Sequence, residues 1–99
     1  MTPYEIEVTP EARQDLLYYD AFDRRIVTSE IRVQLTHEPD VQTRNRKALR
    51  EIPIASWELR AGRFRVFYNV DGDARKVAII AVGHKEHSAL FVRGKEVQI

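Results

Sequence analysis

The chain has 99 residues and a mass of 11.6 kDa, which predicts a single domain over residues 1–99. Its 43% apolar and 31% charged residues are typical of a globular protein and exclude a disordered or fibrous chain. The sequence contains no run of about 18 apolar residues, the length that could span a membrane. The absence of cysteine excludes disulfides and thiolate metal sites. Because the first residues also lack the pattern of a signal peptide, we expect a cytoplasmic protein.

The net charge of +1 conceals a strong separation of charge along the chain. Residues 1–40 carry nine acids and four arginines, a net charge of −5, whereas residues 41–99 carry twelve basic and six acidic residues, a net charge of +6. This separation indicates a polyanionic partner, of which nucleic acid is the commonest, although a solvated charged face explains the same composition. The basic residues of the densest region are Arg44, Arg46, Lys47, Arg50, Arg60, Arg63 and Arg65.

The acidic half is predicted to form one strand and two helices. Residues 4–8 alternate apolar and acidic side chains at period two, as a half-buried strand does. Thr9 before Pro10 is typical of a helix start, and Asp20 is typical of a second one. Pro39 ends the second helix, because the residue before a proline disfavours helix. The residues expected on the apolar face of that helix are Phe22, Ile26, Val27, Ile31 and Leu35.

The basic half is predicted to begin with an irregular segment and to continue with two strands. Residues 41–53 are irregular in pattern, with a short helical turn at 47–50. Residues 57–60 alternate again, and residues 64–70 give the strongest strand signal in the chain. On the second of these strands Arg65 faces away from its aromatic neighbours at positions 64 and 68.

A third strand is predicted at residues 77–82, which are apolar throughout, as in a strand that is covered on both faces. A tight hairpin turn at residues 71–73 precedes it, with Gly72 supplying a positive φ, and Gly83 ends it. The order β-α-α-β-β-β predicts an α+β domain. Its antiparallel sheet forms the core, and the two N-terminal helices pack on one face.

Arg65 is the first candidate for chemistry, because burying an unpaired guanidinium is costly. It either pairs with Glu58 across the hairpin or turns outward, where its fork would hold a phosphate bidentately. The residues alone leave these alternatives open.

A second candidate is the segment 83–87, which follows a buried strand at the edge of the sheet. Histidine as a residue type titrates near neutrality, so His84 or His87 could pass protons, and Lys85 could neutralise a phosphorane. A solvated loop with surface histidines is the alternative. The spacing of the histidines forms no zinc motif, and no glycine-rich phosphate loop is present, so we expect no metal and no cofactor.

The stretch from Ser56 to Asp71 resembles the RelE/ParE superfamily of bacterial toxins from type II toxin–antitoxin modules. The run W-x-L-R-x-G-x-[FY]-R-V-x-Y-x-V-D and the later AVGHK of residues 81–85 carry the resemblance, which covers nearly the whole chain. It implies a cognate antitoxin whose C-terminal segment wraps the helices and sheet. RelE-type members enter the ribosomal A site and cleave mRNA through attack of a ribose 2′-OH on the adjacent phosphate. ParE-type relatives poison DNA gyrase instead.

The chain departs in part from the residues that the RelE-type activity implies. The strand arginine of the family falls on Arg65, but two lysines expected before the hairpin are Ser56 and Glu58 here. The tyrosine that stacks on a base is Phe91, which has no hydroxyl for proton transfer. The glutamate base of another branch is replaced by Lys47.

We therefore expect a substituted catalytic set. Arg65 and Lys85, on which a second family arginine falls, would stabilise the phosphorane, with His84 or His87 as acid and Glu58 as base. The expected RNA-binding residues are Arg44, Arg46, Lys47, Arg50, Arg60, Arg63 and Phe91. The activity expected is metal-independent mRNA cleavage on the ribosome. The alternatives are a toxin that poisons gyrase and a degenerate relative that binds an antitoxin without cleaving.

Overall fold

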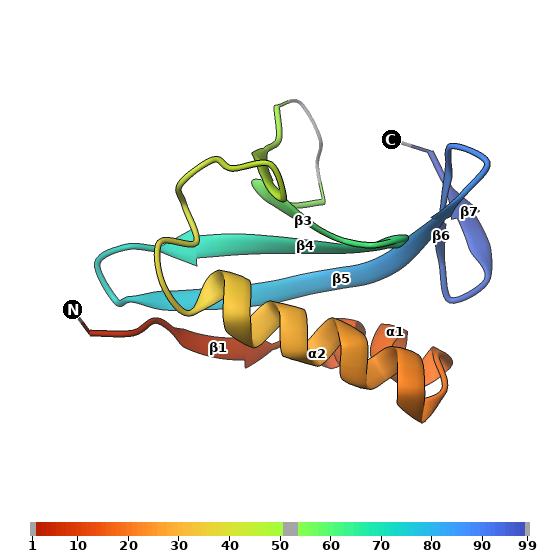
Figure 1. Ribbon diagram of the computed structural model, residues 1–99, viewed down its shortest axis with the longest axis horizontal. Coiled ribbons are helices and arrows are strands. Elements are labelled where there is room, and N and C mark those ends of the chain that lie inside the picture. Colours follow the sequence, from red (N-terminus) through yellow and green to blue (C-terminus); the bar gives the residue numbers. More distant parts are fainter. Residues whose placement is uncertain (1, 51–53, 99) are drawn as a thin grey trace.

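Within residues 2–50 and 54–98, which the computed structural model describes, two helices cover one face of a seven-stranded sheet (Figure 1). β1 (Glu5–Val8) leads into α1 (Pro10–Tyr18) and α2 (Ala21–Leu35). The other strands are β2 (Arg46–Ala48), β3 (Trp57–Ala61), β4 (Phe64–Asp71), β5 (Lys76–Glu86), β6 (Ala89–Val92) and β7 (Lys95–Val97). Strands β2 to β7 are neighbours in chain order, and each pairs antiparallel with the next. The predicted α+β class with both helices on one face is confirmed.

β5 has different partners along its two edges. β4 pairs antiparallel with one edge, from residue 76 to residue 84. On the other edge, β1 pairs in parallel with residues 76–79, and β6 pairs antiparallel with residues 84–86. No strand in the described part of the chain pairs with residues 80–83 on that edge. Their buried backbone groups therefore need other hydrogen-bond partners.

Both predicted helix starts are confirmed by their capping side chains. The Thr9 hydroxyl accepts a hydrogen bond from the Ala12 amide at 3.2 Å and donates one to the Ile79 carbonyl at 2.9 Å. The Asp20 carboxylate accepts from the Asp23 amide at 2.8 Å. Each cap satisfies an amide that has no partner within its helix. Neither helix in the described residues is long and apolar enough to cross a membrane.

The main core lies between the helices and the sheet, and a smaller one lies on the other face of the sheet. Phe64, Val66 and Tyr68 of β4 face the helices, whereas Phe67 packs with Ala55 and Leu90 on the opposite face. The alternation predicted for residues 64–70 is therefore confirmed. The smaller core exists because β6 and β7 curl over that face of the sheet.

The predicted apolar face of the second helix is only partly correct. Val27, Ile31 and Leu35 are buried, but Phe22 is 71% exposed and Ile26 is 39% exposed. At about 100° per residue, Phe22 and Ile26 project roughly 140–180° away from Ile31. Position 22 therefore cannot share the buried face, and the five predicted residues lie on two faces of the helix.

Three short strands were missed, and the predicted helical turn at residues 47–50 is wrong. Residues 46–48 form β2, which pairs with β3. Pairing to a strand that is distant in sequence supplies the backbone partners here, and no local pattern reports it. Residues 51–53, the end of the predicted irregular segment, lie outside the described residues.

Two predictions about glycines are also wrong. Gly83 does not end the strand predicted at residues 77–82, because β5 continues to Glu86. A Cβ at Gly83 would lie 2.5 Å from the Phe91 carbonyl oxygen, so glycine permits the close approach of β6. Gly72 has no positive φ, and the left-handed residue of that hairpin is Arg75, with φ of 53°.

Candidate functional site

The Arg65 guanidinium is held inside the protein on the sheet face opposite the helices. Its Nη1 donates to the carbonyls of Gly62 at 2.7 Å and Phe64 at 2.8 Å. Its Nε lies 3.8 Å from the Glu58 carboxylate, and the two side chains are 10% and 12% exposed. The arrangement corresponds to the pairing across the hairpin and not to an outward fork.

Burial lowers the pKa of Arg65, and the nearby Arg60 charge lowers it further, while Glu58 acts in the opposite direction. Arg60 is the direct partner of Arg65 in the β3–β4 pairing. A guanidinium stays charged at any physiological pH, so Arg60 and Arg65 place two cations beside the Glu58 carboxylate on this face of the sheet. The Nε of Arg65 has no hydrogen-bond acceptor among the described residues.

Lys85 shares the sheet face of Arg65. Arg65 opposes Gly83 in the β4–β5 pairing, and Lys85 lies two residues further along β5, on the same side of the strand. The Lys85 side chain is partly exposed, and its amide donates to the Arg63 carbonyl at 2.8 Å. The two cations that were expected to act together therefore lie on one face.

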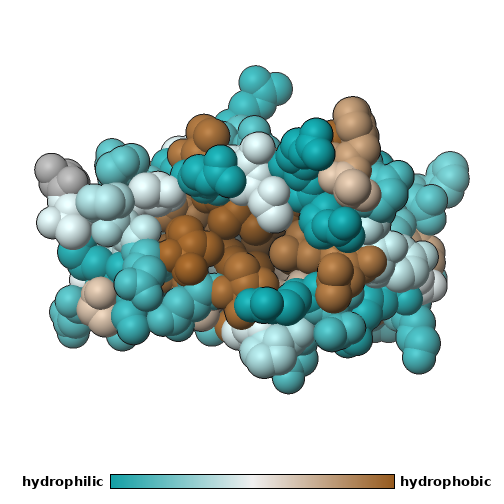
Figure 2. All heavy atoms as spheres, turned by 90° about the horizontal axis from the view of Figure 1, so that it is seen from below, coloured by the Kyte–Doolittle hydropathy of each residue, from teal (hydrophilic) through white to brown (hydrophobic). Residues whose placement is uncertain are grey.

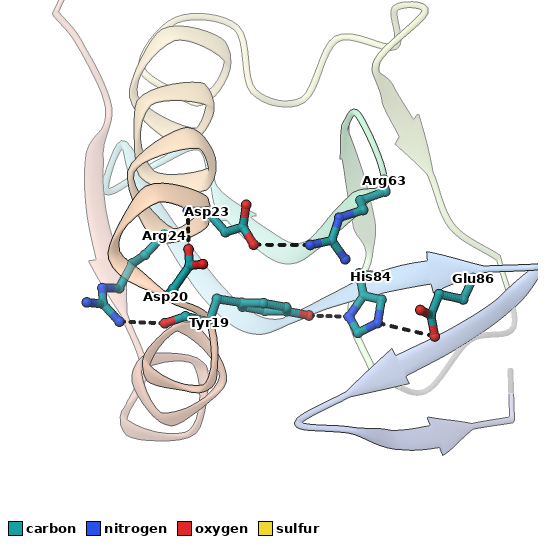
Figure 3. Close-up of polar contacts among 7 residues, drawn as sticks. All are labelled: Tyr19, Asp20, Asp23, Arg24, Arg63, His84 and Glu86. Carbon is teal, nitrogen blue, oxygen red and sulfur yellow. Dashed lines mark hydrogen bonds and ion pairs between the residues drawn. The ribbon is translucent and has the colours of Figure 1, made fainter.

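His84 lies on the opposite face, buried against the helices (Figure 3). Its Nδ1 is 2.6 Å from the Tyr19 hydroxyl, its Nε2 is 3.8 Å from the Glu86 carboxylate, and its ring stacks on Phe91. Burial raises the pKa of Tyr19 to about 12, so the phenol keeps its proton at neutral pH. The hydroxyl and Nδ1 share one hydrogen bond, and the His84 tautomer with its proton on Nε2, toward the Glu86 carboxylate, would let the hydroxyl donate. The structure does not bring His84 together with Arg65.

His87 is exposed in the turn between β5 and β6, which it forms with Ser88. Both residues have positive φ, 49° and 72°. Phe91, the expected base-stacking residue, is partly buried and lies on the His84 ring at a centroid distance of 5.7 Å. Of the two histidines, only His87 is open to a ligand.

The expected RNA-binding arginines and lysine differ in whether their side chains are already bound to other groups of the protein. Arg46 is bound internally, since its Nε donates to the Val41 carbonyl at 3.0 Å and its Nη1 to the Gln34 carbonyl at 2.6 Å. Arg63 pairs with Asp23 at 3.1 Å (Figure 3). The exposed members of the set are Arg44, Lys47, Arg50, Arg60 and also Arg63, whose side chain is 48% exposed. Of the seven expected RNA-binding residues, Arg46 is therefore held by two backbone carbonyls, whereas Arg63 forms a surface ion pair.

The sequence interpretation missed one buried acid, Asp15 of α1. It is 2% exposed, accepts a hydrogen bond from the Val82 amide at 2.9 Å and forms an ion pair with Arg93 Nε at 2.9 Å. The available signal was its spacing from the buried residues Ala12 and Tyr19, which places it on the inner face of the helix. No group of three or more His, Asp or Glu side chains in the described chain could hold a metal ion.

Comparison with known proteins gives one family match and several structural matches. The family model described as ParE toxin of type II toxin-antitoxin system, parDE, matches residues 6–89. The chain is similar to a chain of the RelBE2 toxin-antitoxin complex from Mycobacterium tuberculosis, with 29% identity, a TM-score of 0.75, and coverage of 86% of this chain and 94% of that one. No curated protein matched the sequence.

Two further structures share the fold at lower identity. For the archaeal RelE-RelB complex from Pyrococcus horikoshii the identity is 20%, the TM-score 0.67, and the coverage 88% of this chain and 99% of that one. For the intact RelBE complex from E. coli the values are 22%, 0.62, 85% and 99%. At these identities the likeness establishes the architecture alone.

Proposed function

Because the chain belongs to the ParE toxin family of type II toxin–antitoxin systems, we propose that it arrests growth by binding a protein target and not by cutting RNA. The observation that carries this proposal is the position of the Arg65 guanidinium, 3.8 Å from the Glu58 carboxylate within the protein. The target to test first is DNA gyrase, which the sequence resemblance implies for ParE-type relatives.

The chemistry of RNA cleavage supports this choice. Attack by a 2′-OH needs a base that can reach the hydroxyl, an acid for the leaving oxygen and cations on the phosphorane. The Glu58 side chain is 12% exposed and its carboxylate lies 3.8 Å from the Arg65 guanidinium, so a ribose hydroxyl has little access to it. The His84 imidazole lies on the other face of the sheet, against Tyr19. This arrangement supports a structural role for these groups over joint action on one phosphate.

The same proposal includes a cognate antitoxin. The similar structures from M. tuberculosis, P. horikoshii and E. coli are toxin–antitoxin complexes. Among the described residues six large apolar side chains are exposed, five of them on the helices, and clustered apolar surface of this kind marks sites of protein contact. The exposed residues are Leu17, Tyr18, Phe22, Ile26, Val33 and Val41.

A second candidate is ribosome-dependent mRNA cleavage, and one observation favours it. The buried Nε of Arg65 has no acceptor among the described residues, and Arg65 shares a face with Arg60 and Lys85, so an RNA phosphate could complete its hydrogen bonding once the side chain turns outward. In this candidate Arg65 and Lys85 would stabilise the phosphorane, Glu58 would act as base, and a histidine would act as acid. His87 is then the better choice of acid, because it is exposed.

Brief induction of the toxin in growing cells separates the two candidates. Primer extension on a translated message reports RNA cleavage, and a DNA-damage reporter together with a gyrase cleavage assay reports poisoning of gyrase. We expect growth arrest with no codon-phased cuts and with an active damage reporter. Codon-phased cuts that disappear in a Lys85→Ala variant would support the second candidate in place of the first. Absence of growth arrest would contradict both.

A further inference from the structure

The outer face of α2 carries a stripe of exposed residues at helical spacing. Phe22, Ile26, Ser29 and Val33 are exposed, Val33 to 70%. Their spacing of four, three and four residues places them within about 60° of one another around the helix. Figure 2 shows apolar side chains among hydrophilic ones on the side of the molecule where the helices lie. A stripe of this spacing is the seam along which two helices pack.

A hollow of about 380 Å³ lies on this stripe. Its lining residues are Phe22, Arg25, Ile26, Ser29 and Glu30. The first four follow the spacing i, i+3, i+4 and i+7. This is the set of residues that surrounds one side chain of a facing helix when knobs pack into holes. Because Ser29 is small, the hole can take a branched apolar side chain.

The charged residues beside the stripe are separated by sign. Arg25 and Arg32 lie on one flank, and Asp23 and Glu30 lie on the other, since each pair is seven positions apart. Asp23 is bound to Arg63. Arg25 and Glu30 have no ion-pair partner in the described part of the chain, and neither has a charged residue three or four positions away on the helix. Two unpaired charges of opposite sign therefore stand on opposite flanks of the stripe.

These flanks fit a second copy of α2 in one orientation. When two identical helices pack in parallel about a two-fold axis, opposite flanks meet, so Arg25 of each copy faces Glu30 of the other. In an antiparallel pair each flank meets its own kind, with arginines against arginines and acids against acids. The residues of the seam favour the same orientation, because β-branched side chains at alternate seam positions, here Ile26 and Val33, suit two parallel helices.

We propose that the free protein forms a parallel dimer through the outer face of α2. Ile26 of each copy enters the hole of the other, and two symmetric Arg25–Glu30 pairs fix the register. A second copy is the occupant, because the stripe, the hole and the flanks together are complementary to themselves. The seam runs along only about 17 Å of helix, so the interface is small and the dimer reversible. The inference goes beyond the proposed function and does not depend on the target of the toxin.

An amphipathic helix of another protein, the antitoxin included, is the other occupant that this face could take. Such a helix would also cover Phe22 and Val33. It would leave the free chain monomeric, and it would not require Arg25 and Glu30 to complement each other. The oligomeric state of the free chain therefore separates the two occupants.

Sedimentation equilibrium of the purified full chain at several concentrations measures the dimer. We expect a monomer–dimer equilibrium in the parent and a dissociation constant at least about tenfold higher for Phe22→Ser. Leu17→Ser removes an exposed apolar side chain from α1, so it is the matched control and should leave the constant unchanged. A parent chain that stays monomeric up to about 1 mM would overturn the inference.

Exchange of the two charges tests the orientation. We expect Arg25→Glu and Glu30→Arg each to weaken the dimer by about tenfold, because each places like charges at both contacts. The double variant restores opposite signs and should return to within about threefold of the parent. Arg13→Glu makes the same change in net charge at an exposed position of α1 and is the control. If Arg25→Glu strengthens the dimer, the copies are antiparallel and the inference is wrong.

The remaining outcomes also decide. A dimer that forms in the parent and is unaffected by Phe22→Ser uses another surface, which would overturn the inference. A chain that is monomeric alone, but whose complex with an antitoxin is weakened by Phe22→Ser, would assign the stripe to the antitoxin instead. Circular dichroism checks that each variant is folded, which we expect because every substituted side chain lies at the surface. None of these measurements reads growth arrest, so their result is independent of the proposed function.

Discussion

The Asp15 carboxylate accepts a hydrogen bond at 2.9 Å from the Val82 amide, on the edge of β5 that no strand covers in the described structure. A side chain of α1 thus replaces the strand that would otherwise continue between β1 and β6. The other carboxylate oxygen lies 2.9 Å from Arg93 Nε, just beyond the end of β6. One buried acid therefore joins α1, the central strand and the C-terminal hairpin.

We expect Asp15→Ala to reduce the free energy of unfolding by about 2–4 kcal/mol, because it leaves the buried Val82 amide without an acceptor and removes the partner of Arg93. Urea denaturation measures the change. Glu11→Ala on the exposed face of the same helix is the control and should change stability by less than about 0.5 kcal/mol. Equal effects at the two positions would contradict the role of Asp15.

Asp15 also gives the stability a defined pH dependence. Burial raises its pKa above the usual 3.8, against the opposing effects of the Val82 amide and Arg93, so the folded state binds the proton more tightly than the unfolded state. Stability from that proton is fully present at low pH and is lost as the pH rises through the raised value. We expect the stability of the parent relative to Asp15→Asn to fall as the pH rises above 3.8. A difference that rises over this range would contradict the assignment.

Tyr19→Phe tests the buried hydrogen bond to His84. Removing the hydroxyl leaves Nδ1 without its donor, and we expect a loss of about 1–3 kcal/mol in the free energy of unfolding. Nitrogen NMR of the parent should show the tautomer with the proton on Nε2, and the variant should lose that preference. Tyr18→Phe is the matched control, since Tyr18 is 53% exposed. A parent ring with its proton on Nδ1 would contradict the proposed geometry.

Gly83→Ala tests the close packing of β6 on β5. The added Cβ would lie 2.5 Å from the Phe91 carbonyl oxygen, so the hairpin of β6 and β7 must shift. We expect a loss of about 2–4 kcal/mol in stability and faster amide exchange in that hairpin. Gly72→Ala is the control, because no atom lies within 4 Å of its added Cβ and its φ is not positive. A harmless Gly83→Ala would show that the hairpin does not pack as described.

Local chemistry made part of the fold predictable. The caps at Thr9 and Asp20 act within three residues, and the alternation of β4 depends only on neighbouring side chains, so both follow from short windows. The family was predicted from the resemblance of residues 56–71 to the RelE/ParE superfamily and not from these local patterns. The short strands β2, β6 and β7 are defined by partners rather than by their own residues, and no window of this sequence contains that information.

The candidate site was less predictable, because its contacts join distant positions. The pairing of Arg65 with Glu58 was one of two open alternatives. Only the three-dimensional structure decides whether the guanidinium points inward or outward. His84 was expected in a loop beside Lys85, yet consecutive residues of a strand face opposite sides, and the continuation of β5 separates them. Its partner, Tyr19, is 65 positions away in the sequence.

The most direct test of the account is the growth arrest caused by the double variant Arg65→Met and Glu58→Leu. Replacing a largely buried ion pair by apolar residues of similar size is often neutral for stability, so we expect the variant to remain folded, which circular dichroism checks. If these two residues stabilise the toxin and do not cleave RNA, brief induction of the double variant should arrest growth as strongly as induction of the parent. A folded double variant that no longer arrests growth would contradict the account and assign the pair to the site of action.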